Sequence, residues 1–205
     1  MVEFIAHRIN QRAELANVSK NFGVELDLRD CEKMLHLSHD PFTIGESFDE
    51  YARAYDHGTM ILNIKSERIE LRAIELIKRH KIQKYFFLDS SFPMLKLLSD
   101  LGENNLAVRF SEYEGMDTLR AMRGRARWVW VDCFSRLPLT DIIYQELKDL
   151  NYNICIVSPE LQGQDEKLED YAAYMRQEKI VPDAICSKVY NFERWKKFFE
   201  FPAFG

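Results

Sequence analysis

The feature that most constrains the fold of this chain is the regular alternation of short apolar segments with amphipathic helical segments along its length. KYFFLDS (84–90), RWVWVDCF (127–134) and YNICIVSP (152–159) have the length and apolar character of buried strands, and each precedes a segment with helical periodicity. Eight such strand–helix pairs follow one another. This pattern predicts a parallel sheet, and most simply a closed (β/α)8 TIM barrel formed by residues 1–205 as a single domain. An open doubly wound sheet, which usually has about five or six strands, is the main alternative.

The positions of these elements follow from the apolar patterns. The clearest helix is expected over residues 66–80, where Ile69, Ala73, Leu76 and Ile77 form one apolar stripe. The main strands are expected at 4–9, 23–29, 59–65, 84–90, 106–112, 127–134, 152–159 and 184–189, with a further extended piece at 35–40.

Charge and hydropathy exclude several classes of protein. The net charge is -5, so no general electrostatic attraction to nucleic acid or to an anionic membrane is expected. No apolar run approaches the roughly 18 residues of a membrane helix, so no stable membrane insertion is expected. The N-terminal segment MVEFIAHRINQRAEL lacks the pattern of a signal peptide. We therefore expect a soluble cytoplasmic protein.

The four cysteines do not suggest a zinc site. Cys31, Cys133, Cys155 and Cys186 form no CxxC or CxxH pair. Cys133 and Cys155 lie in apolar, strand-like runs and are expected to be buried thiols.

The segment GVELDLRD (23–30) alternates apolar and charged residues with the period of a strand. In a barrel, Val24, Leu26 and Leu28 would face the helices, and Glu25 and Asp27 would point inward at the mouth. Two buried carboxylates repel one another, so they need a cation or a proton. The alternative is an edge strand with its charged face in water.

Other strands also end in polar residues. The strand at 59–65 would turn Asn63 and Lys65 inward, and His7 and Arg8 end the strand at 4–9. Carboxylates suit a hard divalent cation, Arg8 and Lys65 suit a phosphate, and His7 and His39 suit acid–base chemistry near neutral pH. Weaker candidates at strand ends, which could equally form buried ion pairs, are Asp89, Arg109 and Asp132, and Lys188 also ends a strand.

AHR (6–8), ELD (25–27) and SHD (38–40) resemble, in that order and spacing, the signature of the glycerophosphodiester phosphodiesterases. This family belongs to the superfamily of phosphatidylinositol-specific phospholipase C. SSF (90–92) is also similar to the family. The resemblance implies a (β/α)8 barrel with His7 and His39 as the acid–base pair. It further implies a phosphate site at Arg8 and Lys65 and a divalent cation, Mg2+ or Ca2+, on Glu25 and Asp27.

The chain departs from the family pattern at several points. Ile9 stands where the family usually has Gly, and the Glu-Asn-Thr that normally follows is absent. Asn63 takes the place of the Glu that is the third metal ligand; its amide oxygen can bind a cation, but one negative charge is lost. The insertion that commonly follows the His-Asp pair is missing or reduced to PFTIGES.

The resemblance, together with these residues, implies the metal-dependent hydrolysis of a small phosphodiester, glycerophosphodiester-like or glycan-linked. A non-catalytic or weakly active barrel that binds a phosphorylated metabolite or a partner is the alternative, and Asn63 favours it. A sugar-phosphate isomerase or lyase would explain inward acids and a lysine, but not the order of the motifs. The aromatic segment FFEFPAFG (198–205) is expected to pack across the base of the barrel or to form a homodimer contact.

Overall fold

The computed structural model describes residues 1–32 and 34–199. The chain divides into two compact units. The N-terminal unit comprises Ile5–Leu106, and the C-terminal unit comprises Met1–Phe4 together with the described residues from Ala107 onward. The segment FFEFPAFG, expected to form a contact, lies outside the described residues from position 200 on.

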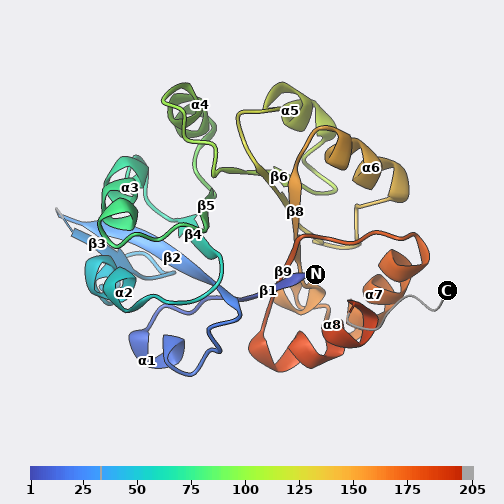
Figure 1. Ribbon diagram of the computed structural model, residues 1–205, viewed down its shortest axis with the longest axis horizontal. Helices are drawn as coiled ribbons and strands as arrows, with labels where there is room; N and C mark the ends of the chain where they lie inside the picture. Colours follow the sequence, from blue (N-terminus) through green and yellow to red (C-terminus); the bar gives the residue numbers. More distant parts are fainter. Residues whose placement is uncertain (33, 200–205) are drawn as a thin grey trace. The chain divides into compact units, whose positions relative to one another are not determined.

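The N-terminal unit contains the strand order β1-β2-β4-β5, with parallel pairing throughout, and β3 pairs antiparallel with β2. Its strands are β1 (Glu3–Ala6, whose first two residues belong to the C-terminal unit), β2 (Gly23–Cys31), β3 (Met34–Leu37), β4 (Met60–Ile64) and β5 (Tyr85–Leu88). Its helices are α1 (Arg12–Leu15), α2 (Phe48–Ala54), α3 (Glu70–Arg79) and α4 (Phe92–Asp100). Figure 1 shows α2 and α3 beside the strands β2, β3 and β4.

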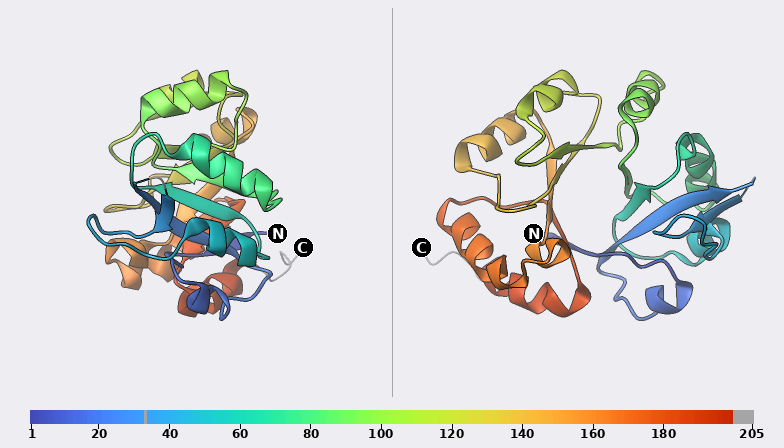
Figure 2. Two further views of the ribbon diagram at one scale, coloured as in Figure 1. Left: turned by 90° about the vertical axis from the view of Figure 1, so that its left-hand side faces the viewer. Right: turned by 180° about the vertical axis from the view of Figure 1, so that it is seen from behind.

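Strand β2 is the centre of this unit. It pairs with β1 on one edge and β4 on the other, and residues 23–28 are all buried. Its apolar residues Val24, Leu26 and Leu28 are completely buried, as expected for a parallel strand covered on both faces. Beyond Leu28 the strand continues as a long hairpin with β3, which reaches away from the rest of the unit (Figure 2).

The C-terminal unit contains the strand order β9-β8-β7-β6, again with parallel pairing. Its strands are β6 (Ala107–Phe110), β7 (Trp128–Val131), β8 (Asn153–Val157) and β9 (Ala184–Ser187). Its α-helices are α5 (Met116–Ala121), α6 (Asp141–Asp149), α7 (Leu168–Gln177) and α8 (Phe192–Phe199). The 3-10 turns are η1 (Pro159–Gln162), η2 (Asp165–Lys167) and η3 (Val189–Asn191). Helices α7 and α8 lie side by side (Figure 1), joined by an ion pair from Arg194 to Glu169, and Arg194 also pairs with Asp165 of η2.

Within the described residues, eight parallel strands each precede a helix, with β3 inserted between β2 and α2, as the sequence predicts for a (β/α)8 barrel. The extended piece expected at 35–40 is shorter and forms β3. Two bounds near the predicted site also differ. Strand β1 ends at Ala6, because Arg8 takes a left-handed φ of 55°, and α3 begins at Glu70 instead of residue 66. His7, Arg8 and Lys65 therefore lie on loops at the ends of strands.

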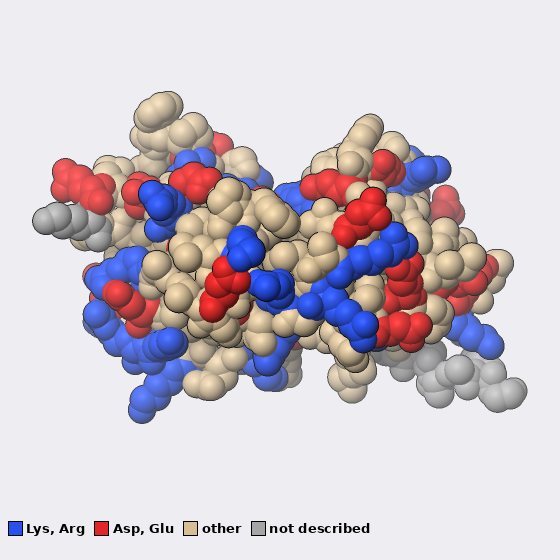
Figure 3. All heavy atoms as spheres, turned by 90° about the horizontal axis from the view of Figure 1, so that it is seen from above, with Lys and Arg blue, Asp and Glu red and all other residues tan. Residues whose placement is uncertain are grey.

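The surface carries positive and negative side chains side by side. On the face drawn in Figure 3, Lys and Arg side chains lie beside Asp and Glu side chains. Among the described residues, every helix is too short or too polar to cross a bilayer.

Candidate functional site

The loop that follows β1 delivers two of the predicted residues to the end of β2. The left-handed turn at Arg8 points its backbone N–H at Glu25, and the distance from the nitrogen to Oε2 is 2.6 Å. The His7 Nε2 atom lies 3.8 Å from the same oxygen. The Arg8 guanidinium turns to the other carboxylate, with Nε 3.5 Å from Asp27 Oδ2. The side chain of His7 thus contacts Glu25, and the side chain of Arg8 contacts Asp27.

Glu25 is buried beside a second carboxylate, and this changes its acidity. Burial raises the pKa of Glu25, the charge of Asp27 raises it further, and the result is about 7. Hydrogen bonds from the Asn63 side chain and the Arg8 backbone oppose this rise in pKa. The Asn63 Nδ2 atom donates to Glu25 Oε1 at 2.8 Å. Asn63 lies on β4, the neighbour of β2, where its backbone is in register with Asp27. Near neutral pH, Glu25 is therefore poised between its charged and neutral forms.

Asp27 is held by a residue that the sequence patterns do not single out. The Asn10 side chain donates from Nδ2 to Asp27 Oδ2 at 2.9 Å and accepts at Oδ1 from the Asp27 backbone N–H at 2.8 Å. Asn10 thereby acts as a pairing partner for the edge of β2 beyond the end of β1. The other carboxylate oxygen, Asp27 Oδ1, is buried and accepts no hydrogen bond within the described residues.

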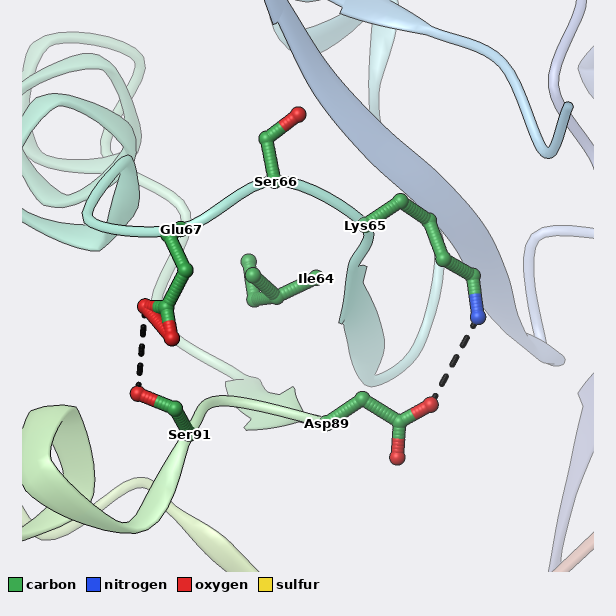
Figure 4. A pocket seen from close by; sticks show the side chains of 6 residues that line it. All are labelled: Ile64, Lys65, Ser66, Glu67, Asp89 and Ser91. Carbon is green, nitrogen blue, oxygen red and sulfur yellow. Dashed lines mark hydrogen bonds and ion pairs between the residues drawn. The ribbon is translucent and has the colours of Figure 1, made fainter. Parts of the chain in front are cut away.

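Lys65 supplies positive charge on the far side of Asp27. Its Nζ lies 3.7 Å from Asp27 Oδ1 and 3.5 Å from Asp89 Oδ2. Its backbone is fixed, since its N–H donates to the Leu28 carbonyl and its own carbonyl accepts from Arg29. Lys65 also borders a pocket of about 350 Å³ at the ends of β4 and β5, where it faces Asp89 (Figure 4).

His39 stands apart from the carboxylates. Its Nδ1 pairs with Asp40 Oδ1 at 2.8 Å, and its imidazole is 41% exposed. This hydrogen bond lowers the pKa of Asp40. The loop is nevertheless tied to β2, because the Arg29 guanidinium donates to the His39 carbonyl as well as to that of Lys65. Within the described residues, the structure gives the His39 ring a partner in Asp40 and not in Glu25 or Asp27.

The chemistry of the buried oxygens fits a hard cation. Asp27 Oδ1 and Asn63 Oδ1 are both buried without a hydrogen bond in the described part of the chain, which is costly unless a further group binds them. The adjacent carboxylates of Glu25 and Asp27 would also be relieved by a positive ion. No group of three or more His, Cys, Asp or Glu side chains among these residues is placed to hold a metal. A cation here would thus need the amide oxygen of Asn63 as a third donor.

The remaining histidines and the strand-end residues Arg109 and Asp132 have structural partners. His36 accepts from the Gly45 N–H, His57 contacts the Val18 carbonyl, and His80 pairs with Asp49. In the C-terminal unit, Arg109 forms an ion pair with Asp132, which is also held by the Trp130 indole.

Asn10 and Arg29 are the contributors to the site that the patterns missed. Asn10 lies outside the strand pattern and reaches Asp27 only because Arg8 reverses the chain. Arg29 is part of GVELDLRD, but its bonds to two backbone carbonyls depend on how the loops after β3 and β4 fold.

Among the comparisons with known proteins, the one with solved structures identifies the fold. Neither a protein-family model nor a curated protein sequence matches the chain. Among solved structures, it is similar to a glycerophosphodiester phosphodiesterase from Agrobacterium tumefaciens, with a TM-score of 0.67 and 14% identity over 92% of this chain and 97% of that one. A glycerophosphoryl diester phosphodiesterase from Parabacteroides distasonis gives a TM-score of 0.67 and 12% identity over 100% and 89% of the two chains. One from Thermotoga maritima gives 0.61 and 16% over 95% and 98%.

These similarities cover nearly the whole of each chain. They show that the protein has the (β/α)8 barrel fold of these structures. The expected resemblance to the glycerophosphodiester phosphodiesterases is therefore confirmed at the level of the fold, and the open doubly wound sheet is excluded. The roles of the individual side chains rest on the geometry described above.

Proposed function

We propose that the protein hydrolyses a phosphodiester with the help of a divalent cation, and that the reaction takes place at the ends of β1, β2 and β4. The observation that carries this proposal is the buried pair of Glu25 and Asp27, which lies between the cations of Arg8 and Lys65. The names of the proteins that share the fold, glycerophosphodiester phosphodiesterases, support the same class of reaction. The substrate would be a glycerophosphodiester or a glycan-linked diester.

Arg8 and Lys65 bind the phosphate in this proposal. Both are anchored on Asp27, at 3.5 Å from Nε of Arg8 and 3.7 Å from Nζ of Lys65, so their charges are held close to the carboxylates. A phosphodiester carries one negative charge, and more charge builds up on its oxygens during the reaction. Two fixed cations stabilise this developing charge more than they stabilise the bound substrate.

His7 and His39 form the acid–base pair. One histidine takes the proton from the attacking hydroxyl or water, and the other protonates the leaving alkoxide. The contact of His7 with Glu25 and that of His39 with Asp40 orient the two rings.

Glu25, Asp27 and Asn63 would hold the divalent cation, Mg2+ or Ca2+. When bound, such an ion neutralises charge on the phosphoryl oxygens. The oxygen donors and the orphaned atoms Asp27 Oδ1 and Asn63 Oδ1 fit a hard ion.

The test is a screen of phosphodiesters against several metals, followed by histidine variants. Glycerophosphodiesters, cyclic phosphates and glycan-linked diesters are offered with Mg2+, Ca2+ or Mn2+. His7→Ala and His39→Ala are each expected to reduce turnover of the best substrate by about 100-fold or more, with an unchanged circular dichroism spectrum. His80→Gln is the matched control, since His80 pairs with Asp49 at the end of α3, and it should keep its turnover. Wild-type rates in both alanine variants would refute the mechanism.

A second function is favoured by one contact. Asn63 is neutral, whereas a carboxylate at this position would add a negative charge to the cation site. Its Nδ2 atom also donates a hydrogen bond to Glu25 Oε1, one of the proposed cation ligands. A barrel with this site could bind a phosphorylated metabolite or a partner without hydrolysing it. Phosphate-ester binding without turnover of any diester, and without stabilisation by millimolar divalent cations, would favour this reading.

A further inference from the structure

The mechanism above uses only Lys65 among the residues that line the neighbouring pocket. This pocket lies at the ends of β4 and β5 and is lined by Ile64, Lys65, Ser66, Glu67, Asp89 and Ser91 (Figure 4). Its volume of about 350 Å³ is near the lower end of the range for ligand sites. Only one of the six lining side chains is aliphatic, so the pocket suits a small polar group and not an acyl chain.

The carboxylates of this pocket are held in place. The Glu67 Oε2 atom accepts a hydrogen bond from the Ser91 hydroxyl at 3.1 Å, which links the loops after β4 and β5. Asp89 has a left-handed φ of 61°, and its carboxylate faces Lys65, with Oδ2 3.5 Å from Nζ. Figure 4 shows these two contacts on opposite sides of the pocket.

Lys65 forms the boundary between the pocket and the carboxylates of β2. It is the one cation among the lining residues, and Asp27 and Asp89 already share its charge. Arg68 follows Glu67 in the chain but does not line the pocket. When a phosphate is bound at Lys65, the rest of the pocket therefore presents the carboxylates of Glu67 and Asp89 and the Ser91 hydroxyl. The Ser66 hydroxyl points away from the pocket, where it accepts from the Asp30 N–H.

We propose that this pocket holds an alcohol group of the diester, and that Glu67 and Asp89 make it select against alcohol groups that carry a carboxylate or a second phosphate. The proposal rests on the proposed function and names the substrate class for it. A hydroxyl or an ammonium group can donate hydrogen bonds to Glu67 and Asp89. An added anion is repelled and finds no free cation among the lining residues.

Two substrates that differ by one carboxylate test this selection. Glycerophosphoethanolamine and glycerophosphoserine both release glycerol phosphate when the bond to the amino alcohol is hydrolysed, so one coupled assay serves both. The wild-type protein is expected to favour the ethanolamine ester by about tenfold in kcat/KM, which is the size of a ~1.4 kcal/mol difference. Equal values, or a preference for the serine ester, would overturn the proposal.

Variants of the two carboxylates give the proposal a second readout. Glu67→Gln and Asp89→Asn are each expected to reduce the ratio of the two kcat/KM values by about threefold or more. The ratio is the readout because Asp89 also contacts Lys65, so the absolute rates will change. Glu75→Gln removes a carboxylate on the exposed side of α3, where it pairs with Arg72, and should leave the ratio unchanged. Equal loss of both rates with an unchanged ratio in both pocket variants would contradict the selection.

A binding measurement separates failure of this proposal from failure of the proposed function. Titration calorimetry with phosphoethanolamine and phosphoserine requires no turnover. If no diester is hydrolysed but phosphoethanolamine binds more tightly, and Glu67→Gln narrows the difference, the pocket is supported and the hydrolase is not. If both ligands bind equally, or neither binds, the pocket proposal fails whether or not diesters are hydrolysed.

Discussion

Carboxylates at the strand ends of the two units have different hydrogen-bond partners. In the N-terminal unit, Glu25 and Asp27 lie close together, and Asp27 Oδ1 accepts no hydrogen bond in the described part of the chain. In the C-terminal unit, Glu160 accepts hydrogen bonds from the Ser158 and Ser187 hydroxyls and from the Lys188 N–H at 3.0 Å. Asp27 therefore keeps a carboxylate oxygen without a hydrogen bond, whereas Glu160 accepts from three donors.

Under the proposed function, Glu25 and Asp27 serve the chemistry, whereas Glu160 serves stability. A carboxylate with a full set of donors is stabilised in its charged form and joins loops together. Ser158 also accepts from the Trp195 indole, so the Glu160 network ties β8 and β9 to α8. A carboxylate pair with unused oxygens destabilises the fold unless a proton or a ligand binds, as is common at functional sites.

The largest expected effect comes from removing one charge of the pair. Glu25→Gln is expected to reduce phosphodiester turnover by about 100-fold or more, since it removes a charged donor from the proposed cation site. The unfolding free energy near pH 7 should stay equal or rise, because a destabilising buried charge is lost. Steady-state kinetics and urea unfolding on the same preparation measure both quantities. Turnover close to wild type would contradict the chemical role of Glu25.

The next effect is a dependence of stability on pH that the same substitution removes. The pKa of Glu25 is raised from 4.5 to about 7, so the folded state binds more protons than the unfolded state between these values. The contribution of Glu25 to stability is therefore fully present below pH 4.5 and is lost as the pH rises through about 7, by up to about 3 kcal/mol.

Urea unfolding with a metal chelator, from pH 5 to 8, measures this loss. The wild-type protein should lose stability relative to Glu25→Gln as the pH rises, and the difference should level off above pH 8. If the unfolding free energies of the two proteins change in parallel with pH, the pKa of Glu25 is not raised in the folded state.

In the C-terminal unit, removing a carboxylate is expected to lower stability and to leave cation binding intact. Glu160→Ala leaves the Ser158 and Ser187 hydroxyls, which are completely buried, without their shared acceptor. We expect a loss of ~2 kcal/mol in the free energy of unfolding, with the response to divalent cations retained. Thermal unfolding with and without Mg2+ checks both. A stability equal to that of the wild type would remove the contrast between the two units.

A smaller effect is expected for the residue that supports Asp27. Asn10→Ala removes one hydrogen bond to the Asp27 side chain and one from its backbone. The expected loss is ~1 kcal/mol of stability and about tenfold in kcat/KM. Asn17→Ala is the matched control, because the Asn17 side chain donates to the Ala13 carbonyl on an exposed part of the same unit. If both variants behave alike, Asn10 has no special part in the site.

The fold could be predicted because its signals are local. Apolar runs followed by amphipathic segments determine the order of strands and helices, and the alternation in GVELDLRD places Glu25 and Asp27 on one face. Arg8, Lys65 and Asn63 could be proposed for the site because each stands at or near the end of a parallel strand.

Other features depend on contacts that no local pattern records. The left-handed turn at Arg8 brings Asn10 to Asp27, and nothing in the segment around it favours that turn. The pairing of His39 with Asp40 and the network around Glu160 arise from loop conformations after the strands. Glu67 and Asp89 line the same pocket although they lie 22 positions apart in the sequence.

The most direct test of the central claim is a titration of thermal unfolding with divalent cations. Wild-type protein and Asp27→Asn are unfolded in increasing millimolar Mg2+, Ca2+ or Mn2+, and Tm is recorded. Wild-type Tm should rise with at least one ion, since a ligand at 100 times its Kd stabilises a protein by about 2.7 kcal/mol, and the rise should be largely lost in Asp27→Asn. A wild-type Tm that does not respond to any of the three ions, or an equal response in both proteins, would contradict a cation site at Glu25, Asp27 and Asn63.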